Sequence, residues 1–448
     1  MGRSLRENGT GSLGFMNAWR VYLEPCALRM AFFGFSSGLP LLLVLGTLSF
    51  RLREAGIDLK TIGFLSWIGL VYGFKWVWAP FIDRVRVPLL TRLLGRRRSW
   101  LLLSQVALIF GLCVMALADP GKALMPLAAA ALFCAFASAT QDIALDAYRI
   151  ESASEERQAA LAAMYQTGYR LGMIWAGAGA LAVAAWFEQE GVGYDLSGWR
   201  MSYFVMAASV LVGVIATILS PEPEVLTSRT KSSDAVANDC QKRSFFSALA
   251  APVTVFFQRF GRSALLILLL IATYRISDIL MGVMANPFYA DIGFSKSQVA
   301  GITKVFGVVM TLAGAFVGGA ATMRYGVMRI LMCGALLSCL TNFLFSILAG
   351  LGPNVVFLAL TVSADNLASG LSSAAFMAYL SGLTTKGYTA TQYALFSSLM
   401  LMVPKFLAGF SGYLVEAIGY GSFFSMTALI GLPVFGLVWA VSWHERRR

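Results

Sequence analysis

The sequence predicts an all-α polytopic membrane protein with twelve transmembrane helices in two pseudo-symmetric six-helix bundles. The chain of 448 residues is 58% hydrophobic and only 13% charged, whereas a soluble protein carries about a quarter charged residues. Apolar runs of about 20 residues recur along the chain, and each is long enough to cross the roughly 30 Å hydrocarbon layer of a bilayer. One long polar segment, residues 220–261, separates these runs into two sets of six.

The apolar runs define the elements in chain order. We predict spans at residues 26–51, 60–82, 99–118, 123–147, 158–186, 199–219, 262–286, 297–322, 327–349, 353–380, 390–417 and 421–443. The corresponding divisions are a cytoplasmic tail (1–25), an N-terminal bundle (26–219), a cytoplasmic linker (220–261), a C-terminal bundle (262–443) and a basic tail (444–448). Because the runs are continuously apolar, they do not fit the alternating strands of a membrane β-barrel.

Basic residues indicate the orientation in the membrane. Lys and Arg concentrate in the loop after the second span, in the linker and in the last three residues of the chain. Since such residues favour the cytoplasmic side, both termini are predicted to be cytoplasmic. The net charge of +12 therefore reflects topology, and we expect no binding of nucleic acid. Within the linker, apolar residues at helical spacing predict an amphipathic helix on the membrane surface: Phe245, Leu249, Phe256 and Phe260.

The two halves of the chain repeat each other weakly. "AGIDLKTIGFLSWIG" at the second span matches "IGFSKSQVAGITKVFG" at the eighth, and "EERQAALAAMYQTGYR" at the fifth matches "TATQYALFSSLMLMVPK" at the eleventh. Parallel repeats of six helices around a central cavity are typical of major facilitator transporters.

Carboxylates inside the spans are candidates for coupling transport to protons, because a charge in the membrane is costly unless it is paired or hydrated. Asp142, Asp146 and Arg149 share one helix face at positions i, i+4 and i+7. The single histidine, His444, lies in the tail, so a titrating group must be a carboxylate whose pKa is raised by desolvation. The candidates are Asp142, Asp146, Asp278 and Asp365. The alternative is that Asp142 pairs permanently with a cation on a neighbouring helix.

Cations inside the spans outnumber these acids and suggest an anionic cargo. They are Lys75, Arg170, Arg275, Lys304 and Lys405, and with Gln141, Tyr169 and Trp78 they form the predicted substrate site. Arg170 and Lys405 occupy corresponding places in spans 5 and 11, so we expect both to face the central cavity. The alternative is salt bridges between helices, for which Arg275 and Asp278 at i, i+3 are best placed. The sequence contains no motif for ATP hydrolysis, catalysis, a cofactor or a metal, so we predict a protein that is not an enzyme.

Several blocks resemble known proteins. An acidic residue at the end of the second span, followed at a longer spacing than usual by a Gly-Arg-rich loop, resembles the gating loop of the major facilitator superfamily: Asp83 and Arg84, then Gly95, Arg96 and Arg97. The blocks "YGFKWVWAPFIDR", "GRRRSWLLLSQ", "ASATQDIALDAYRIE" and "ATQYALFS" resemble those of the AmpG family of muropeptide permeases across nearly the whole transport core.

The resemblance implies a specific function. It implies proton-driven import of GlcNAc-anhydromuropeptides across the bacterial inner membrane during cell-wall recycling. Separately, we predict a monomer without a cofactor. The partners would be an anionic glycopeptide, protons and the lipid bilayer. Two related branches leave alternatives open: a transporter of acetyl-CoA or another anionic metabolite, and a membrane factor for pigment assembly that transports nothing.

Overall fold

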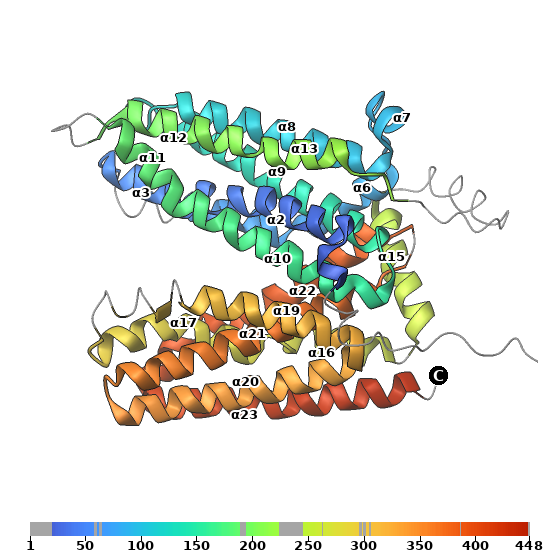
Figure 1. The fold of residues 1–448 in the computed structure, drawn as a ribbon, viewed down its shortest axis with the longest axis vertical. Coiled ribbons are helices and arrows are strands. Elements are labelled where there is room, and N and C mark those ends of the chain that lie inside the picture. The colour runs from blue at the N-terminus through green and yellow to red at the C-terminus, as the bar shows by residue number, and fades with distance from the viewer. Residues whose placement is uncertain are drawn as a thin grey trace, which may run out of the picture.

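The architecture consists of two helical bundles joined by a linker helix. A computed structural model describes residues 20–57, 61, 65–188, 194–223, 245–261, 263–294, 298, 302–303, 306–385 and 387–446. These residues are helical almost throughout and contain no strand. Figure 1 shows the N-terminal half, coloured blue to green, above the C-terminal half, coloured yellow to red.

The N-terminal half contains η1 (Val21–Leu23), α2 (Pro25–Val44), α3 (Gly46–Glu54), η2 (Ser66–Gly69), α5 (Leu70–Gly73), η3 (Lys75–Val77), α6 (Ala79–Arg84), α7 (Leu90–Leu94), α8 (Arg96–Leu117), α9 (Leu124–Glu151), η4 (Glu155–Arg157), α10 (Gln158–Ile174), η5 (Trp175–Gly179), α11 (Ala180–Phe187), α12 (Leu196–Ser209) and α13 (Leu211–Leu219). The linker helix is α15 (Phe245–Phe260), and the C-terminal half contains α16 (Ser263–Thr273), α17 (Ile276–Asp291), α19 (Gly307–Tyr325), α20 (Val327–Leu351), α21 (Val355–Leu383), α22 (Thr389–Ala408) and α23 (Ser411–Arg446).

Ten helices among the described residues are long and apolar enough to cross a membrane. They correspond to all of the twelve predicted spans except the second and the eleventh. The second span consists of short pieces, η2, α5, η3 and α6, and its polar residues include Lys75. The eleventh is the 20-residue helix α22, which carries Thr389, Gln392 and Lys405 and is less apolar than the others.

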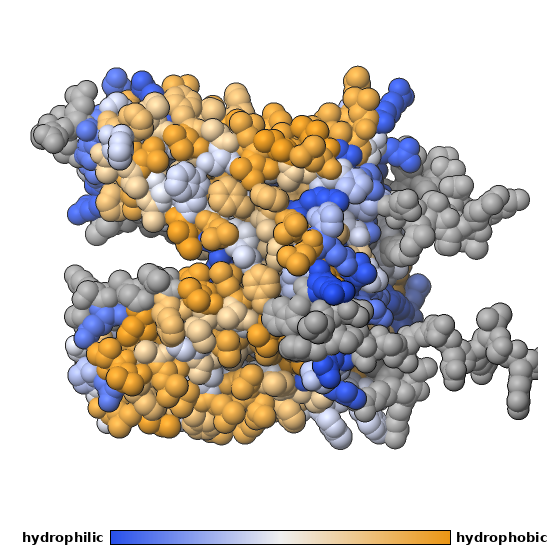
Figure 2. All heavy atoms as spheres, in the orientation of Figure 1, coloured by the Kyte–Doolittle hydropathy of each residue, from blue (hydrophilic) through white to orange (hydrophobic). Residues whose placement is uncertain are grey.

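The two bundles touch along one half of their facing surfaces, which we call the seam. We call the end of the molecule where α7, α15 and the end of α23 lie the linker side (right in Figure 1) and the opposite end the open side. Figure 2 shows a cleft between the bundles on the open side, and hydrophobic side chains over the flanks of both bundles. On the linker side a buried hydrophobic cluster crosses the seam and joins Leu161 and Met164 to Ala320 and Met323.

Small residues let the helices within each half approach closely. A Cβ atom on Gly168 of α10 would lie 1.8 Å from the carbonyl oxygen of Ala31 in α2, and one on Gly34 would lie 2.0 Å from that of Tyr165. In the C-terminal half, a Cβ on Gly314 of α19 would lie 2.1 Å from the carbonyl oxygen of Leu367 in α21. Glycine at these positions therefore allows backbone contact between helices, as is common in membranes.

The linker helix α15 packs on protein. Phe256 is only 2% exposed, and its ring centre lies 5.2 Å from that of Phe396 in α22. Arg259 donates to the carbonyl oxygens of Leu383 (3.3 Å) and Thr384 (3.0 Å) at the end of α21. The prediction of a helix lying on the membrane surface is therefore wrong for Phe256, because an aromatic row at helical spacing suits a protein groove as well as a bilayer.

We expect Gly168→Ala to destabilise the protein by about 1–3 kcal/mol, because the added methyl group forces α2 and α10 apart. Thermal unfolding in detergent measures the change. Gly282→Ala in α17 is the matched control, since a Cβ atom there meets nothing within 4 Å, and it should leave stability unchanged or slightly raised. Equal unfolding temperatures for the two variants would contradict the close contact.

Candidate functional site

On the linker side, a buried carboxylate of one half forms hydrogen bonds with the other half across the seam. Asp83, in the last turn of α6, accepts hydrogen bonds from the backbone N–H groups of Ala390 (3.2 Å) and Thr391 (2.8 Å) and from the Thr391 hydroxyl (2.7 Å). These groups form the first turn of α22 in the other half. A helix N-terminus has unpaired N–H groups and a positive partial charge, so it is a favourable place for a carboxylate. Asp83 therefore fastens the two halves together.

Arg97 holds Asp83 in place from within the N-terminal half. Its guanidinium is 1% exposed and lies 2.9 Å from Asp83 Oδ1 and 2.5 Å from Glu151 Oε1. Arg96 donates to the backbone carbonyl of Asp83 at 2.8 Å. Such charge-assisted bonds to a rigid guanidinium fix both distance and direction. Asp83 is thus aimed at α22 before the halves meet.

A second carboxylate anchors the helix that carries Arg97. Glu222, just after α13, accepts from the backbone N–H groups of Arg97 (2.7 Å) and Arg98 (3.1 Å) at the start of α8. Gly95 precedes this helix with φ +87°, and a Cβ atom there would lie 2.4 Å from the Glu222 side chain. Glycine at position 95 is therefore required by both the backbone conformation and the space.

The predicted gating-loop residues Asp83, Gly95, Arg96 and Arg97 thus lie together at one end of the molecule. Arg84 directly follows Asp83 as the last residue of α6. The partners Glu151, Glu222 and Thr391 were not singled out from the sequence. The available signal was that Glu151 and Thr391 lie in or beside the distinctive blocks "ASATQDIALDAYRIE" and "ATQYALFS".

A cluster of two cations and one carboxylate lies nearby. Asp146 Oδ1 is 3.6 Å from Arg149 Nη2, and its Oδ2 is 3.8 Å from Lys75 Nζ. Arg149 also reaches across the seam, donating to the Ser381 hydroxyl at 3.2 Å and stacking over the Tyr393 ring at 5.2 Å. Asp146 and Arg149, which share one face of α9, therefore form an ion pair, and Arg149 in addition contacts the opposite half.

Asp142 has a different environment from Asp146, one turn away. It accepts a hydrogen bond from the Ser37 hydroxyl of α2, which itself lies 3.1 Å from the Tyr165 hydroxyl. The neighbouring Gln141 donates to Ser36 at 3.2 Å. No ion pair involves Asp142 in the part of the chain that the structure describes, so the alternative of a permanent salt bridge finds no support in this conformation.

The C-terminal half contains a comparable group. Asp278 accepts a hydrogen bond from the Ser338 hydroxyl, and Asp365 is 3.4 Å from the Thr341 hydroxyl. Arg275 lies where the seventh span breaks between α16 and α17. Its Nε is 3.7 Å from Asp278 Oδ2, and its Nη1 donates to the Ser373 hydroxyl at 2.6 Å. The ion pair between Arg275 and Asp278, which was the alternative to cargo binding, is therefore present in this conformation.

Of the other predicted cargo residues, the structure describes Arg170 and Lys405. Arg170 is exposed and forms no ion pair with a described residue. Lys405 is also exposed and follows Met402 by three residues; Met402 lies against Gly73 of the N-terminal half. The structure shows no contact between Arg170 and Lys405. Lys304 lies outside the described residues.

The two aromatic candidates have structural partners. The Trp78 indole donates to Thr140 at 3.1 Å, and its ring centre is 4.7 Å from that of Phe136. The Tyr169 ring lies 6.0 Å from that of Tyr165. Trp78 is therefore held mainly by its own half, whereas Tyr169 directly precedes the exposed Arg170.

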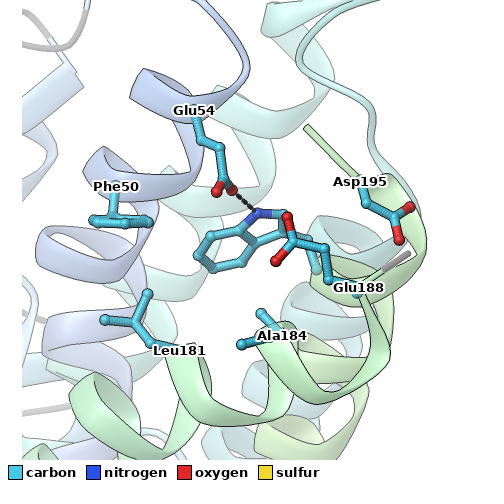
Figure 3. A pocket seen from close by; sticks show the side chains of 9 residues that line it. Phe50, Glu54, Leu181, Ala184, Glu188 and Asp195 are labelled. Carbon is cyan, nitrogen blue, oxygen red and sulfur yellow. Dashed lines mark hydrogen bonds between the residues drawn. The ribbon is translucent and has the colours of Figure 1, made fainter. Parts of the chain in front are cut away.

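A separate cavity of about 230 Å³ lies at the open-side end of the N-terminal half (Figure 3). Its wall contains Glu54, Glu188, Asp195 and Trp199. Glu54 accepts from the Trp199 indole at 2.5 Å, and Asp195 caps α12 through the Ser197 N–H at 2.8 Å. Two of the three carboxylates therefore stabilise the local fold. Among the described residues no group of His, Cys, Asp or Glu is arranged to hold a metal ion.

Comparison with known proteins agrees with this architecture. The sequence model of the Major Facilitator Superfamily matches residues 26–276. The chain is 34% identical over 415 residues to a protein named anhydromuropeptide permease from Escherichia coli K12, covering 92% of this chain and 79% of that one. It is 31% identical over 418 residues to a putative transporter AmpG 4 from Rickettsia conorii, covering 93% and 97%.

Solved structures show the same fold at low sequence identity. The transporter FucP in the outward conformation gives a TM-score of 0.67 at 15% identity and covers 94% of this chain and 99% of its own. The proton:xylose symporter XylE gives 0.66 at 13% identity, covering 94% and 95%.

We expect Asp83→Asn to loosen the linker side, because a neutral amide binds the α22 N-terminus and Arg97 more weakly than a carboxylate. Hydrogen bonds to charged groups contribute about 1.5–3 kcal/mol, so opening should become about tenfold or more as frequent. The measurement is the alkylation rate of Ser381→Cys, a site 3% exposed beneath the seam, in a background without the six native cysteines. Asp119→Asn, in a turn between α8 and α9, should not change this rate. Equal rates for all three proteins would contradict the role of Asp83.

Proposed function

Because this chain belongs to the major facilitator superfamily and, within it, to the AmpG permease family, we propose that it imports GlcNAc-anhydromuropeptides across the inner membrane, driven by protons. It is a transporter and not an enzyme. The observation that carries the proposal is the 34% identity to the anhydromuropeptide permease over 92% of this chain. The cargo would be returned to the cytoplasm for cell-wall recycling.

The shape of the molecule supports transport by alternating access. The cleft is open at one end (Figure 2), and the seam closes the other through Asp83, Arg149 and the hydrophobic cluster. A transporter that holds its cargo between two repeats must be able to close either end around it. Asp83 and Arg149 make hydrogen bonds across the seam, and these bonds can be replaced by bonds to water when this end opens.

The distribution of cations supports an anionic cargo. Arg170 has no carboxylate partner among the described residues, and Arg275 shares only a loose 3.7 Å contact with Asp278. Guanidinium groups bind carboxylates bidentately, and a muropeptide carries carboxylates on its stem peptide. We therefore assign the cargo's carboxylates to Arg170 and Arg275, with Lys405 as a further cation beside the cleft and Lys75 closer to the seam.

Four carboxylates support coupling to protons. Asp142 and Asp365 each have a hydroxyl neighbour and no ion pair among the described residues, whereas Asp146 and Asp278 are paired with cations. An unpaired carboxylate inside a membrane protein is less costly when it is protonated. Asp142 and Asp365 are therefore the preferred proton carriers, and Asp146 and Asp278 the less preferred ones.

The linker side is proposed to face the cytoplasm. The end of α23 lies on this side with α15 and α7 (Figure 1), as does the start of α8 with Arg96 and Arg97. Positive residues favour the cytoplasmic surface. The cleft of this conformation would then face the periplasm, from which the cargo enters.

Uptake into proteoliposomes tests the proposal. The purified chain should accumulate labelled GlcNAc-anhydroMurNAc-peptide only when the proton concentration outside exceeds that inside. Asp142→Asn should abolish gradient-driven accumulation and retain exchange of the cargo between the two sides, because the proton site is lost and the cargo site remains. Wild-type accumulation in Asp142→Asn would remove this residue from coupling. Uptake of acetyl-CoA instead, or of neither compound, would contradict the proposed cargo.

We expect Arg170→Gln and Arg275→Gln to weaken binding of the glycopeptide by about 10- to 100-fold, because each loses a charged hydrogen bond. Titration of the purified protein with the ligand measures this. A ligand whose stem-peptide carboxylates are amidated should bind the variants and the wild type alike. Arg200→Gln, at an exposed site in α12, is the control. Equal loss for both ligands would mean that the arginines hold the helices together and do not contact the peptide.

A further inference from the structure

A short turn ahead of the first span enters the seam. Residues Val21–Leu23 form the 3-10 helix η1 directly before α2. Tyr22 lies near the N-terminus, yet it is only 6% exposed. It belongs to the hydrophobic cluster that crosses the seam. Neither the predicted gate nor the predicted cargo site contains this tyrosine.

Tyr22 connects the first half of the chain to α19 of the second. Its hydroxyl donates to the backbone carbonyl of Phe316 at 2.7 Å, and the two rings meet edge to face with centres 4.9 Å apart. Two residues further on, Glu24 forms an ion pair of 2.7 Å with Arg157 of η4. The segment is therefore anchored on its own half while its tip binds the opposite one.

The groove that receives the tyrosine depends on one glycine. A Cβ atom on Gly319 of α19 would lie 2.3 Å from the Tyr22 hydroxyl and 3.2 Å from the carbonyl oxygen of Ala159 in α10. Any side chain at position 319 would displace the hydroxyl. Gly319 therefore provides the space that the Tyr22 hydroxyl occupies.

We propose that Tyr22 is a latch that holds the linker side closed and must leave the Gly319 groove before this side opens. The contacts of Asp83 and Tyr22 hold different helices of the C-terminal half, since Asp83 fastens α22 to α6, and Tyr22 fastens α19, which packs beside α10. Tyr22 is a positioning residue, since it affects release of the cargo only by holding α19 against the N-terminal half and need not contact the cargo itself. That the released molecule is a glycopeptide rests on the proposed function; the latch itself does not.

The contact of Tyr22 with α19 must break in every transport cycle, so its contribution to the free energy of the closed state has to be modest. When Tyr22 leaves, its hydroxyl exchanges the bond to the Phe316 carbonyl for a bond to water, and such a bond contributes about 0.5–1.5 kcal/mol net. Removing the hydroxyl alone should thus raise the ratio of linker-side-open to closed molecules by about two- to tenfold. The ring contact remains in a phenylalanine variant.

The test measures the distance between spin labels by electron paramagnetic resonance, without cargo. Labels at Leu93→Cys and Tyr325→Cys, both exposed, report the linker-side opening of the full-length chain without its six native cysteines, in lipid nanodiscs. Tyr22→Phe should increase the long-distance population by the stated ratio. Gly319→Ala should do so at least as strongly, because its methyl group expels the hydroxyl.

The double variant and a control separate the latch from general packing. In Tyr22→Phe/Gly319→Ala the second change should add much less than it does alone. Tyr203→Phe removes another buried tyrosine–carbonyl bond, 3.0 Å to Leu43, inside one half, and should not shift the distances. Wild-type distances in Tyr22→Phe, or full additivity in the double variant, would overturn the latch. Since no cargo is present, a failed uptake assay leaves this result unaffected.

Discussion

The structure depends on one electrostatic contact, the carboxylate of Asp83 against the first turn of α22. A charge buried at a contact between two bundles is tolerated only when it is well paired. Here the pairing is complete: Arg97 fixes the carboxylate from one side, and two N–H groups and a hydroxyl receive it on the other. Arg97 belongs to the same half as Asp83, whereas the N–H groups and the hydroxyl belong to the other half. Separating the halves would therefore replace only the bonds to the N–H groups and the hydroxyl by bonds to water.

Each half also contains its own carboxylate inside the membrane spans. In each half a serine on a neighbouring helix donates to a membrane carboxylate: Ser37 to Asp142, and Ser338 to Asp278. The cations differ between the two sites, since Asp278 has Arg275 and Asp142 has none within ion-pair distance among the described residues. The same architecture thus gives one carboxylate that is paired with a cation and one that has a hydroxyl partner and no cation within ion-pair distance among the described residues.

Residue spacing in the sequence is sufficient to predict contacts between residues on the same helix. The contacts of Asp146 with Arg149 and of Arg275 with Asp278 follow from i, i+3 geometry, and the two-bundle fold follows from the apolar runs. Contacts between distant segments could not be predicted in this way: Thr391 lies 308 residues from Asp83. The aromatic row that places Phe256 against α22 has the same pattern as a membrane-surface helix. The second span is divided into the short helices η2, α5, η3 and α6, and hydrophobic periodicity does not register such breaks.

We propose that closing the cleft and opening the seam are one linked movement driven by the cargo. The most direct measurement follows both ends of one protein in nanodiscs, with spin labels at Trp186→Cys and Leu351→Cys on the open side and at Leu93→Cys and Tyr325→Cys on the linker side. On saturation with the anionic glycopeptide at acidic pH, the open-side distance should shorten and the linker-side distance should lengthen. Distances that both stay constant, or change in the same direction, in a protein that still takes up the cargo would contradict the account.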